Sequence, residues 1–175
     1  RNKLKLSAPS TNNKWTDIFF SQSNNLQNFK YNELNEISFK SKKITNKKIN
    51  EFILLENDNL ITTDIRGNIL VYSIKEKKIL RKFNFYKKRL RNISKYLNIY
   101  VENNTIYVSD NIGYLYAYNY LENKIKWAKN YKIPFRGNLK IFKNKLITSN
   151  QNNNLYFFNK LNGETLKLIP TEETI

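Results

Sequence analysis

Few side chains in this sequence have the types and spacing that catalysis or metal binding requires. The 175 residues include no His and no Cys, which excludes a Ser-His-Asp triad, a thiol nucleophile, a disulfide framework and a cysteine-bound zinc ion. Aspartate occurs at positions 17, 58, 64 and 110, too sparsely for the oxygen cage that Ca²⁺ prefers. Glu172 and Glu173 are adjacent but follow Pro170 in a terminal tail, where a solvated pair is expected. We therefore predict no catalytic, cofactor-binding or metal-binding residue.

Positive charge is the second chemical feature of the chain. Lys and Arg number 31 against 14 Asp and Glu, which gives a formal net charge of +17. The cluster Lys87, Lys88, Arg89 and Arg91 could contact phosphate or an acidic surface, or it could be a solvated loop. Lys, Asn and Ile are abundant along the whole chain, as an AT-rich genome would produce, so the charge alone leaves both interpretations open.

Alternating tyrosines form a third pattern, at Tyr114, Tyr116, Tyr118 and Tyr120. In a strand, alternate residues share one face, so these rings could offer a stacking platform for nucleic-acid bases. The same spacing is also typical of a strand face that packs against a neighbouring sheet. We favour packing and keep nucleic-acid binding as the rival hypothesis.

An internal repeat indicates which elements position these side chains. Residues 60–72, 106–118 and 146–158 each contain an apolar strand, a polar turn and a second strand with alternating polarity. Each turn begins with a side chain that can accept hydrogen bonds from turn amides: Asp64, Asp110 and Asn150. Each turn also contains a residue that tolerates positive φ: Gly67, Gly113 and Asn153. Every copy is therefore predicted to form a β-hairpin.

The hairpins extend into larger units of about 40–45 residues, because an apolar strand precedes each and a short strand follows each. Four short antiparallel strands per unit are the signature of a β-propeller blade. We predict three blades, over residues 49–86, 95–130 and 137–170, within a domain spanning residues 36–175. The hydrophobic fraction of 40% is sufficient for a packed core.

Two expectations concern the ends of this all-β array. Residues 37–40 are predicted to add one isolated strand, and the Asn- and Ser-rich residues 1–35 are predicted to form an N-terminal arm. Closed propellers typically need about four or more blades. We therefore expect the sequence to be part of a larger propeller, with closure by oligomerisation as the alternative.

The blades resemble the quinoprotein-like repeat, in which the hairpin leads to a Leu-Tyr-Ala-Leu strand and a Gly-Lys-x-x-Trp ending. The middle copy matches best, with Gly113-Tyr114-Leu115-Tyr116-Ala117-Tyr118 followed by Asn123-Lys124-Ile125-Lys126-Trp127. The tryptophan position holds Arg81 in the first copy and Lys167 in the third.

Within that superfamily the chain is similar to the BamB family, the propeller lipoproteins of the outer-membrane protein assembly machinery. Trp15 with the Asn-rich residues 21–28 resembles the segment that precedes the first blade in such proteins. Ile133-Pro134-Phe135-Arg136-Gly137 resembles the segment that leads into a following blade. The resemblance implies about eight blades in the whole protein.

The resemblance also implies a non-catalytic scaffold at the periplasmic face of the outer membrane, held by a lipid anchor that would lie outside this chain. Its partner would be the POTRA domains of the β-barrel insertase. A Leu-Arg pair makes this contact in the family, and Phe135-Arg136 is the nearest match here. An inter-blade turn without a partner role is the alternative for these residues, and a basic propeller adaptor elsewhere in the cell is the alternative for the function.

Overall fold

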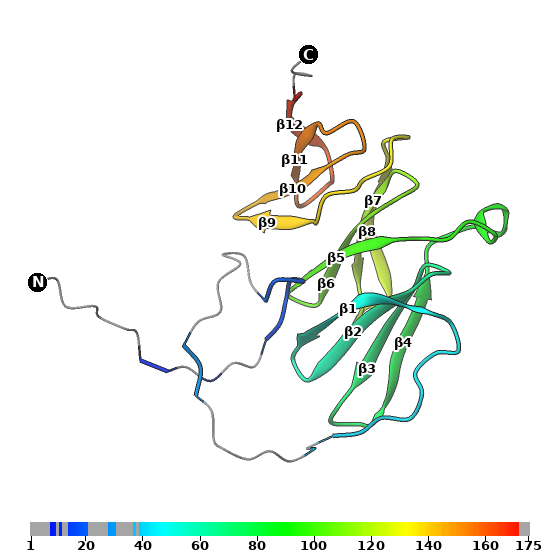
Figure 1. Ribbon diagram of the computed structural model, residues 1–175, viewed down its shortest axis with the longest axis vertical. Helices are drawn as coiled ribbons and strands as arrows, with labels where there is room; N and C mark the ends of the chain where they lie inside the picture. Colours follow the sequence, from blue (N-terminus) through cyan, green and yellow to red (C-terminus); the bar gives the residue numbers. More distant parts are fainter. Residues whose placement is uncertain are drawn as a thin grey trace, which may run out of the picture.

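The computed structural model describes residues 8, 9, 11, 14–20, 28–30, 37 and 39–171, and within them the chain is nearly all β. The strands form three four-stranded antiparallel sheets, each in the sequential order of a β-meander (Figure 1). The first sheet holds β1 (Ile49–Glu56), β2 (Asn59–Asp64), β3 (Asn68–Ser73) and β4 (Lys78–Asn84). The second holds β5 (Leu97–Glu102), β6 (Thr105–Asp110), β7 (Tyr114–Asn119) and β8 (Lys124–Asn130). The third holds β9 (Lys140–Phe142), β10 (Lys145–Ser149), β11 (Leu155–Asn159) and β12 (Thr165–Ile169).

The turn between the second and third strand of each sheet has the chemistry that the repeat predicts. The Asp110 carboxylate accepts hydrogen bonds from the backbone N–H groups of Ile112, Gly113 and Tyr114, at 2.8–2.9 Å. Asp64 and Asn150 accept equivalent bonds in the first and third sheets. Gly113 has φ +100°, and a Cβ there would lie 2.9 Å from the backbone nitrogen of Ile133. Glycine is therefore needed at this position for both backbone conformation and space.

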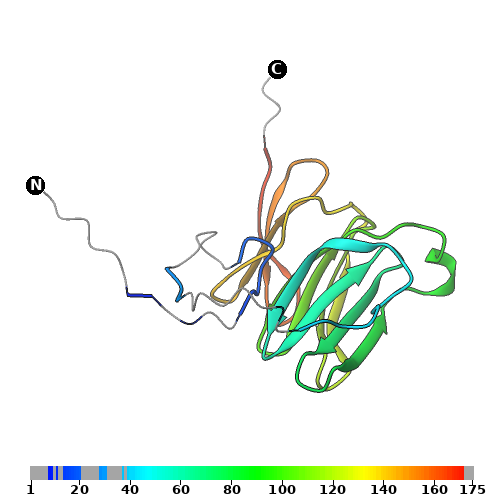
Figure 2. The same ribbon diagram turned by 60° about the horizontal axis from the view of Figure 1, so that its bottom comes forward.

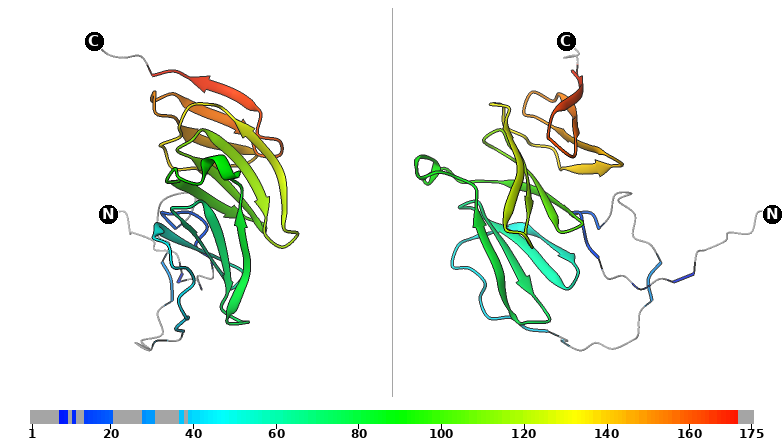
Figure 3. Two further views of the ribbon diagram at one scale, coloured as in Figure 1. Left: turned by 90° about the vertical axis from the view of Figure 1, so that its right-hand side faces the viewer. Right: turned by 180° about the vertical axis from the view of Figure 1, so that it is seen from behind.

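The sheets lie face to face in chain order, as adjacent blades of a β-propeller do (Figures 2 and 3). We call them blades 1, 2 and 3, and their strands lie inside the three predicted blade ranges. Aliphatic residues of blade 1, such as Ile61 and Ile69, pack with Ile99 and Val108 of blade 2 in one fully buried cluster. A second cluster joins blade 2 to blade 3 around Phe158. The predicted all-β propeller segment of four-stranded blades is confirmed.

The tyrosine stripe belongs to the first of these clusters. Tyr116, Tyr118 and Tyr120 are at most 1% exposed. The rings of Tyr116 and Tyr118 stack on Phe85 and Phe83, with ring centroids 4.5 and 4.1 Å apart. These faces are occupied by blade 1, so they are inaccessible to nucleic-acid bases. The packing interpretation is correct and the stacking platform is wrong.

The N-terminal segment contributes differently from the prediction. Residues 37, 39 and 40 form no strand, and Ser38 lies outside the described residues, so the isolated strand over 37–40 is not observed. Phe39 instead packs its ring on Tyr72, 5.6 Å between centroids. Most of the predicted arm, residues 1–35, also lies outside the described residues.

The described residues 14–20 run along the first strands of all three blades. Trp15 pairs with Leu55 of β1 through two backbone hydrogen bonds of 2.8 Å, and the Thr16 carbonyl accepts from the Val101 N–H of β5 at 3.0 Å. Asp17 forms an ion pair of 2.5 Å with Lys140 of β9. This segment therefore ties the three blades together at one edge of each sheet (Figure 1).

The described residues contain one short 3₁₀ turn, η1 (Lys88–Leu90), in the connection from β4 to β5. No helix in this part of the chain has the length and apolar character to cross a membrane.

Candidate interaction surfaces

The connection between blades 2 and 3 holds the predicted partner-binding residues Phe135 and Arg136. Phe135 is only 2% exposed, and its ring packs against Tyr131 and Phe158, with centroids 5.9 and 6.0 Å away. Arg136 is exposed. The burial of Phe135 therefore leaves Arg136 as the member of the predicted pair that a partner can reach.

Backbone hydrogen bonds hold this connection rigidly. The N–H of Phe135 donates to the Asp110 carbonyl at 2.9 Å, and the N–H groups of Arg136 and Gly137 donate to the Ser149 carbonyl at 3.0 and 3.1 Å. The side chain of Arg136 adjoins a recess of about 470 Å³. The recess is lined by Tyr96, Asn98, Asn111, Pro134, Phe135, Arg136 and Gln151. A fixed cation beside a polar recess can accept an acidic or hydrogen-bonding group of another protein.

The predicted basic patch, Lys87, Lys88, Arg89 and Arg91, lies in the connection from β4 to β5. All four residues are exposed. The connection projects away from the sheets, to the right in Figure 1. None of the four forms a salt bridge among the described residues and none is buried, so the patch is accessible to a flat acidic surface. The fourth, Arg91, also lines a cavity described below.

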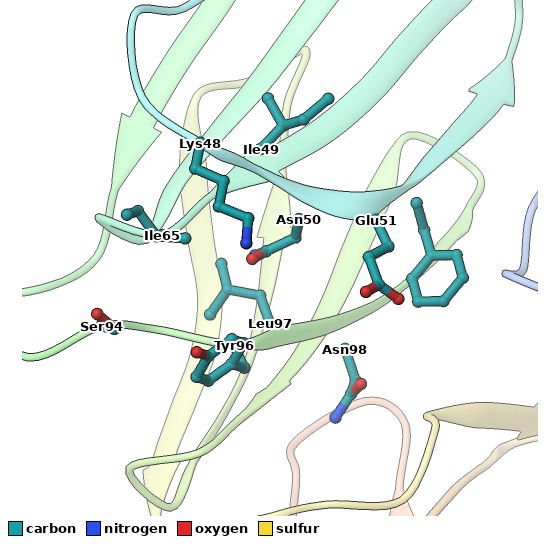
Figure 4. A pocket seen from close by; sticks show the side chains of 10 residues that line it. Lys48, Ile49, Asn50, Glu51, Ile65, Ser94, Tyr96, Leu97 and Asn98 are labelled. Carbon is teal, nitrogen blue, oxygen red and sulfur yellow. The ribbon is translucent and has the colours of Figure 1, made fainter.

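A pocket of about 310 Å³ lies between β1 and β5 (Figure 4). Its lining combines the apolar residues Ile49, Phe52, Ile65 and Leu97 with Lys48, Asn50, Glu51, Ser94, Tyr96 and Asn98. The charges of Lys48 and Glu51 balance, so the pocket has no preference for a cation or an anion. The sequence carries no signal for this pocket, because its two walls come from segments that are far apart in the chain.

The outer face of blade 3 presents several apolar side chains and carries no further sheet in the described part of the chain. Ile147 and Phe157 are paired across β10 and β11, and Leu155 and Ile169 across β11 and β12. Their equivalents in blades 1 and 2, such as Ile69 and Leu115, are fully buried against the following blade. In blade 3 these side chains are only partly buried, and Ile169 is 38% exposed.

A carboxylate–phenol contact joins blade 1 to blade 2 in the interior. The Tyr86 hydroxyl donates to the Asp110 carboxylate at 2.5 Å. Burial raises the pKa of Tyr86 and also raises the pKa of Asp110. Since three turn amides also bind Asp110, the geometry indicates a structural acceptor. No cluster of three acidic side chains that could hold a metal ion occurs among the described residues.

Comparison with known proteins supports the architecture. No protein-family model matches the sequence, and curated protein sequences give no match. Among solved structures, BamB from Moraxella catarrhalis is similar with a TM-score of 0.57 and 15% identity, over 69% of this chain and 35% of that one. Quinohemoprotein alcohol dehydrogenase from Comamonas testosteroni is similar with a TM-score of 0.66 and 12% identity, over 90% and 27% of the two chains.

The computationally designed Ika4 protein is a further similar structure, with a TM-score of 0.62 and 11% identity over 77% of this chain and 82% of that one. At these identities the similarity shows the fold alone. The matched region covers 35% of the BamB chain, so this chain spans about a third of the length of that protein. The fold-level resemblance to quinoprotein-like propellers is therefore confirmed.

Proposed function

We propose that this protein is a non-catalytic, protein-binding scaffold of the outer-membrane β-barrel assembly machinery, acting at the periplasmic face of the outer membrane. Its partner is the POTRA domains of the insertase. A lipid anchor outside this chain provides the membrane association. Propellers host many functions, so the fold supports this proposal without deciding it.

The observation that carries the proposal is the presentation of Arg136. Its backbone is held by hydrogen bonds on both sides, and its side chain is exposed beside a recess. A rigid loop loses little conformational entropy on binding, which favours specific recognition. Arginine is also among the residues that most often dominate the binding energy of protein interfaces. The similarity to a BamB structure supports the proposed function at the level of the fold alone.

The test is titration of the 175-residue chain with purified POTRA domains, using Arg136→Ala as the variant. Loss of a central arginine contact costs about 2 kcal/mol or more, so Kd should rise at least about tenfold. Lys126→Ala is the matched control, because it removes one exposed positive charge from β8. Absence of binding by the unmodified chain, or an equal effect of both substitutions, would contradict the proposal.

A second candidate is a basic adaptor that binds an acidic surface or nucleic acid, and the full exposure of the basic patch favours it. Under this function, affinity for a random DNA duplex should fall steeply with salt concentration. Neutralising Lys87, Lys88, Arg89 and Arg91 together should flatten that salt dependence. A salt slope that the quadruple substitution leaves unchanged would reject the patch as the contact surface.

A further inference from the structure

A cavity of about 550 Å³ lies where the β2–β3 turn of blade 1 meets the connection from β4 to β5. Four basic side chains line it: Lys47, Arg66, Arg91 and Lys95. They come from three separate parts of the chain. No acidic residue is part of the lining. The pocket between β1 and β5 differs in this respect, since it contains both Lys48 and Glu51.

Hydrogen bonds fix the wall around these cations. The Nη1 of Arg66 donates to the Arg91 carbonyl at 2.8 Å, which joins the turn to the connection. The Nδ2 of Asn84 donates to the Arg66 carbonyl at 3.1 Å and to Oδ1 of Asn68 at 2.9 Å. The site is therefore organised before any ligand arrives, which reduces the entropic cost of binding.

Lys95 is the most unusual of the four cations, because the residue is only 1% exposed. Its Nζ donates to the Leu90 carbonyl and lies 5.2 Å from the centroid of the Tyr86 ring. It forms no salt bridge among the described residues. Burial and the nearby charge of Arg66 lower the pKa of Lys95. A buried cation without a carboxylate partner is costly, and a bound anion would relieve that cost.

The two carboxylates nearest to the cavity are already engaged. Asp64 is fully buried and accepts hydrogen bonds from the backbone N–H of Arg66 and from the side chain of Asn68. Asp110 accepts the Tyr86 hydroxyl and three turn amides. When the charges of these two carboxylates are subtracted from those of the four cations, the net charge around the cavity is still positive.

We propose that this cavity binds the phosphate group of a small molecule or lipid headgroup. Four converging cations match a multiply charged oxyanion better than a single carboxylate, and arginine guanidinium groups suit phosphate geometry. The volume is in the range of ligand pockets, about 300–1,000 Å³, and so leaves room for more than the phosphate itself. This inference is independent of the POTRA proposal, since Arg136 lies on a different connection.

The test is isothermal titration of the 175-residue chain with inorganic phosphate and with pyrophosphate, at about 0.15 M salt to screen non-specific attraction. Lys95→Met and Arg66→Gln should each weaken binding about tenfold or more, because each removes a charged contact. Lys126→Met is the control, since Lys126 is an exposed cation of β8 outside both the cavity lining and the basic patch. It should change Kd less than about twofold.

A flotation assay with phosphatidylcholine vesicles, with and without phosphatidate, distinguishes the source of the phosphate. Binding of the soluble probes supports a free phosphorylated ligand, whereas Lys95-dependent binding to phosphatidate vesicles alone supports a headgroup. Circular dichroism of Lys95→Met shows whether the variant folds, and Arg66→Gln provides an independent variant if it does not. Absence of saturable binding to every probe, or equal losses in Lys126→Met and the cavity variants, would overturn the proposal.

Discussion

Asp110 shows how one residue combines a local and a long-range role. Its carboxylate organises the β6–β7 turn and receives the Tyr86 hydroxyl from the preceding connection. Burial is the largest influence on this carboxyl, and it raises the pKa above the ordinary value of 3.8. The folded protein therefore binds this proton more tightly than the unfolded chain does. The stabilisation is fully present below pH 3.8 and is lost as the pH rises through the folded-state pKa.

Replacing Asp110 by Asn should therefore change the pH dependence of stability. As the pH rises above 3.8, the unmodified protein should lose free energy of unfolding relative to Asp110→Asn, by about 1.4 kcal/mol for each unit of the pKa difference. Urea denaturation at a series of pH values measures this difference. Asp58→Asn is the control, because it removes an exposed carboxylate. Parallel stability curves for the unmodified protein and Asp110→Asn would contradict the expectation.

At the scale of elements, one repeat position links each blade to the next. In blade 1, Arg81 donates from Nε to the Tyr120 carbonyl at 3.0 Å. In blade 2, Trp127 donates from Nε1 to the Lys160 carbonyl at 3.0 Å. Different side chains therefore make the same contact with the following blade. This explains why the sequence can depart from tryptophan at position 81 without losing the architecture.

Replacing Trp127 by Phe should weaken the contact between blades 2 and 3. The substitution removes the hydrogen bond and part of the ring that packs over Gly163, where an added Cβ would lie 2.5 Å from Cζ3. The free energy of unfolding should fall by about 1–3 kcal/mol, measured by urea denaturation and circular dichroism. Trp15→Phe changes a ring that is 38% exposed and should cost less than about 1 kcal/mol. Equal losses would show that the inter-blade contact contributes little.

At the scale of the whole molecule, the three blades differ in how well they are covered. Blades 1 and 2 each have a following blade on the same face, whereas blade 3 carries no such sheet in the described chain. In arrays of repeats, stability depends on the interface between neighbours. Blade 3 should therefore be the least stable part of the described array.

The equivalent residues Ile69 and Leu155 provide a direct comparison. Ile69→Ala removes a side chain that is 0% exposed and packs on blade 2, so it should cost about 2–4 kcal/mol of unfolding free energy. Leu155→Ala removes a partly buried side chain from the outer face of blade 3 and should cost about 1 kcal/mol or less. Chemical denaturation of both variants measures the difference. A similar cost at the two positions would mean that another part of the chain covers blade 3.

The sequence by itself determined the local architecture of the blades. Asp64, Asp110 and Asn150 mark the turns, and their side chains bind turn amides as their spacing predicted. The sequence also predicted which strand residues share a face, because successive side chains in a strand point to opposite faces of the sheet. Blade number and strand order within the described residues follow from these local signals.

Only the tertiary structure decided which side chains can meet a ligand or partner. Phe135 and Arg136 are adjacent in sequence, yet one is buried between blades and the other is exposed. Arg66 and Lys95 are distant in sequence, yet they line one cavity. The physical reason is that local patterns set strands and turns, whereas burial and charge clustering depend on how neighbouring blades and their connections pack. Blade packing brings together residues that neither the strand alternation nor the repeat spacing relates to one another.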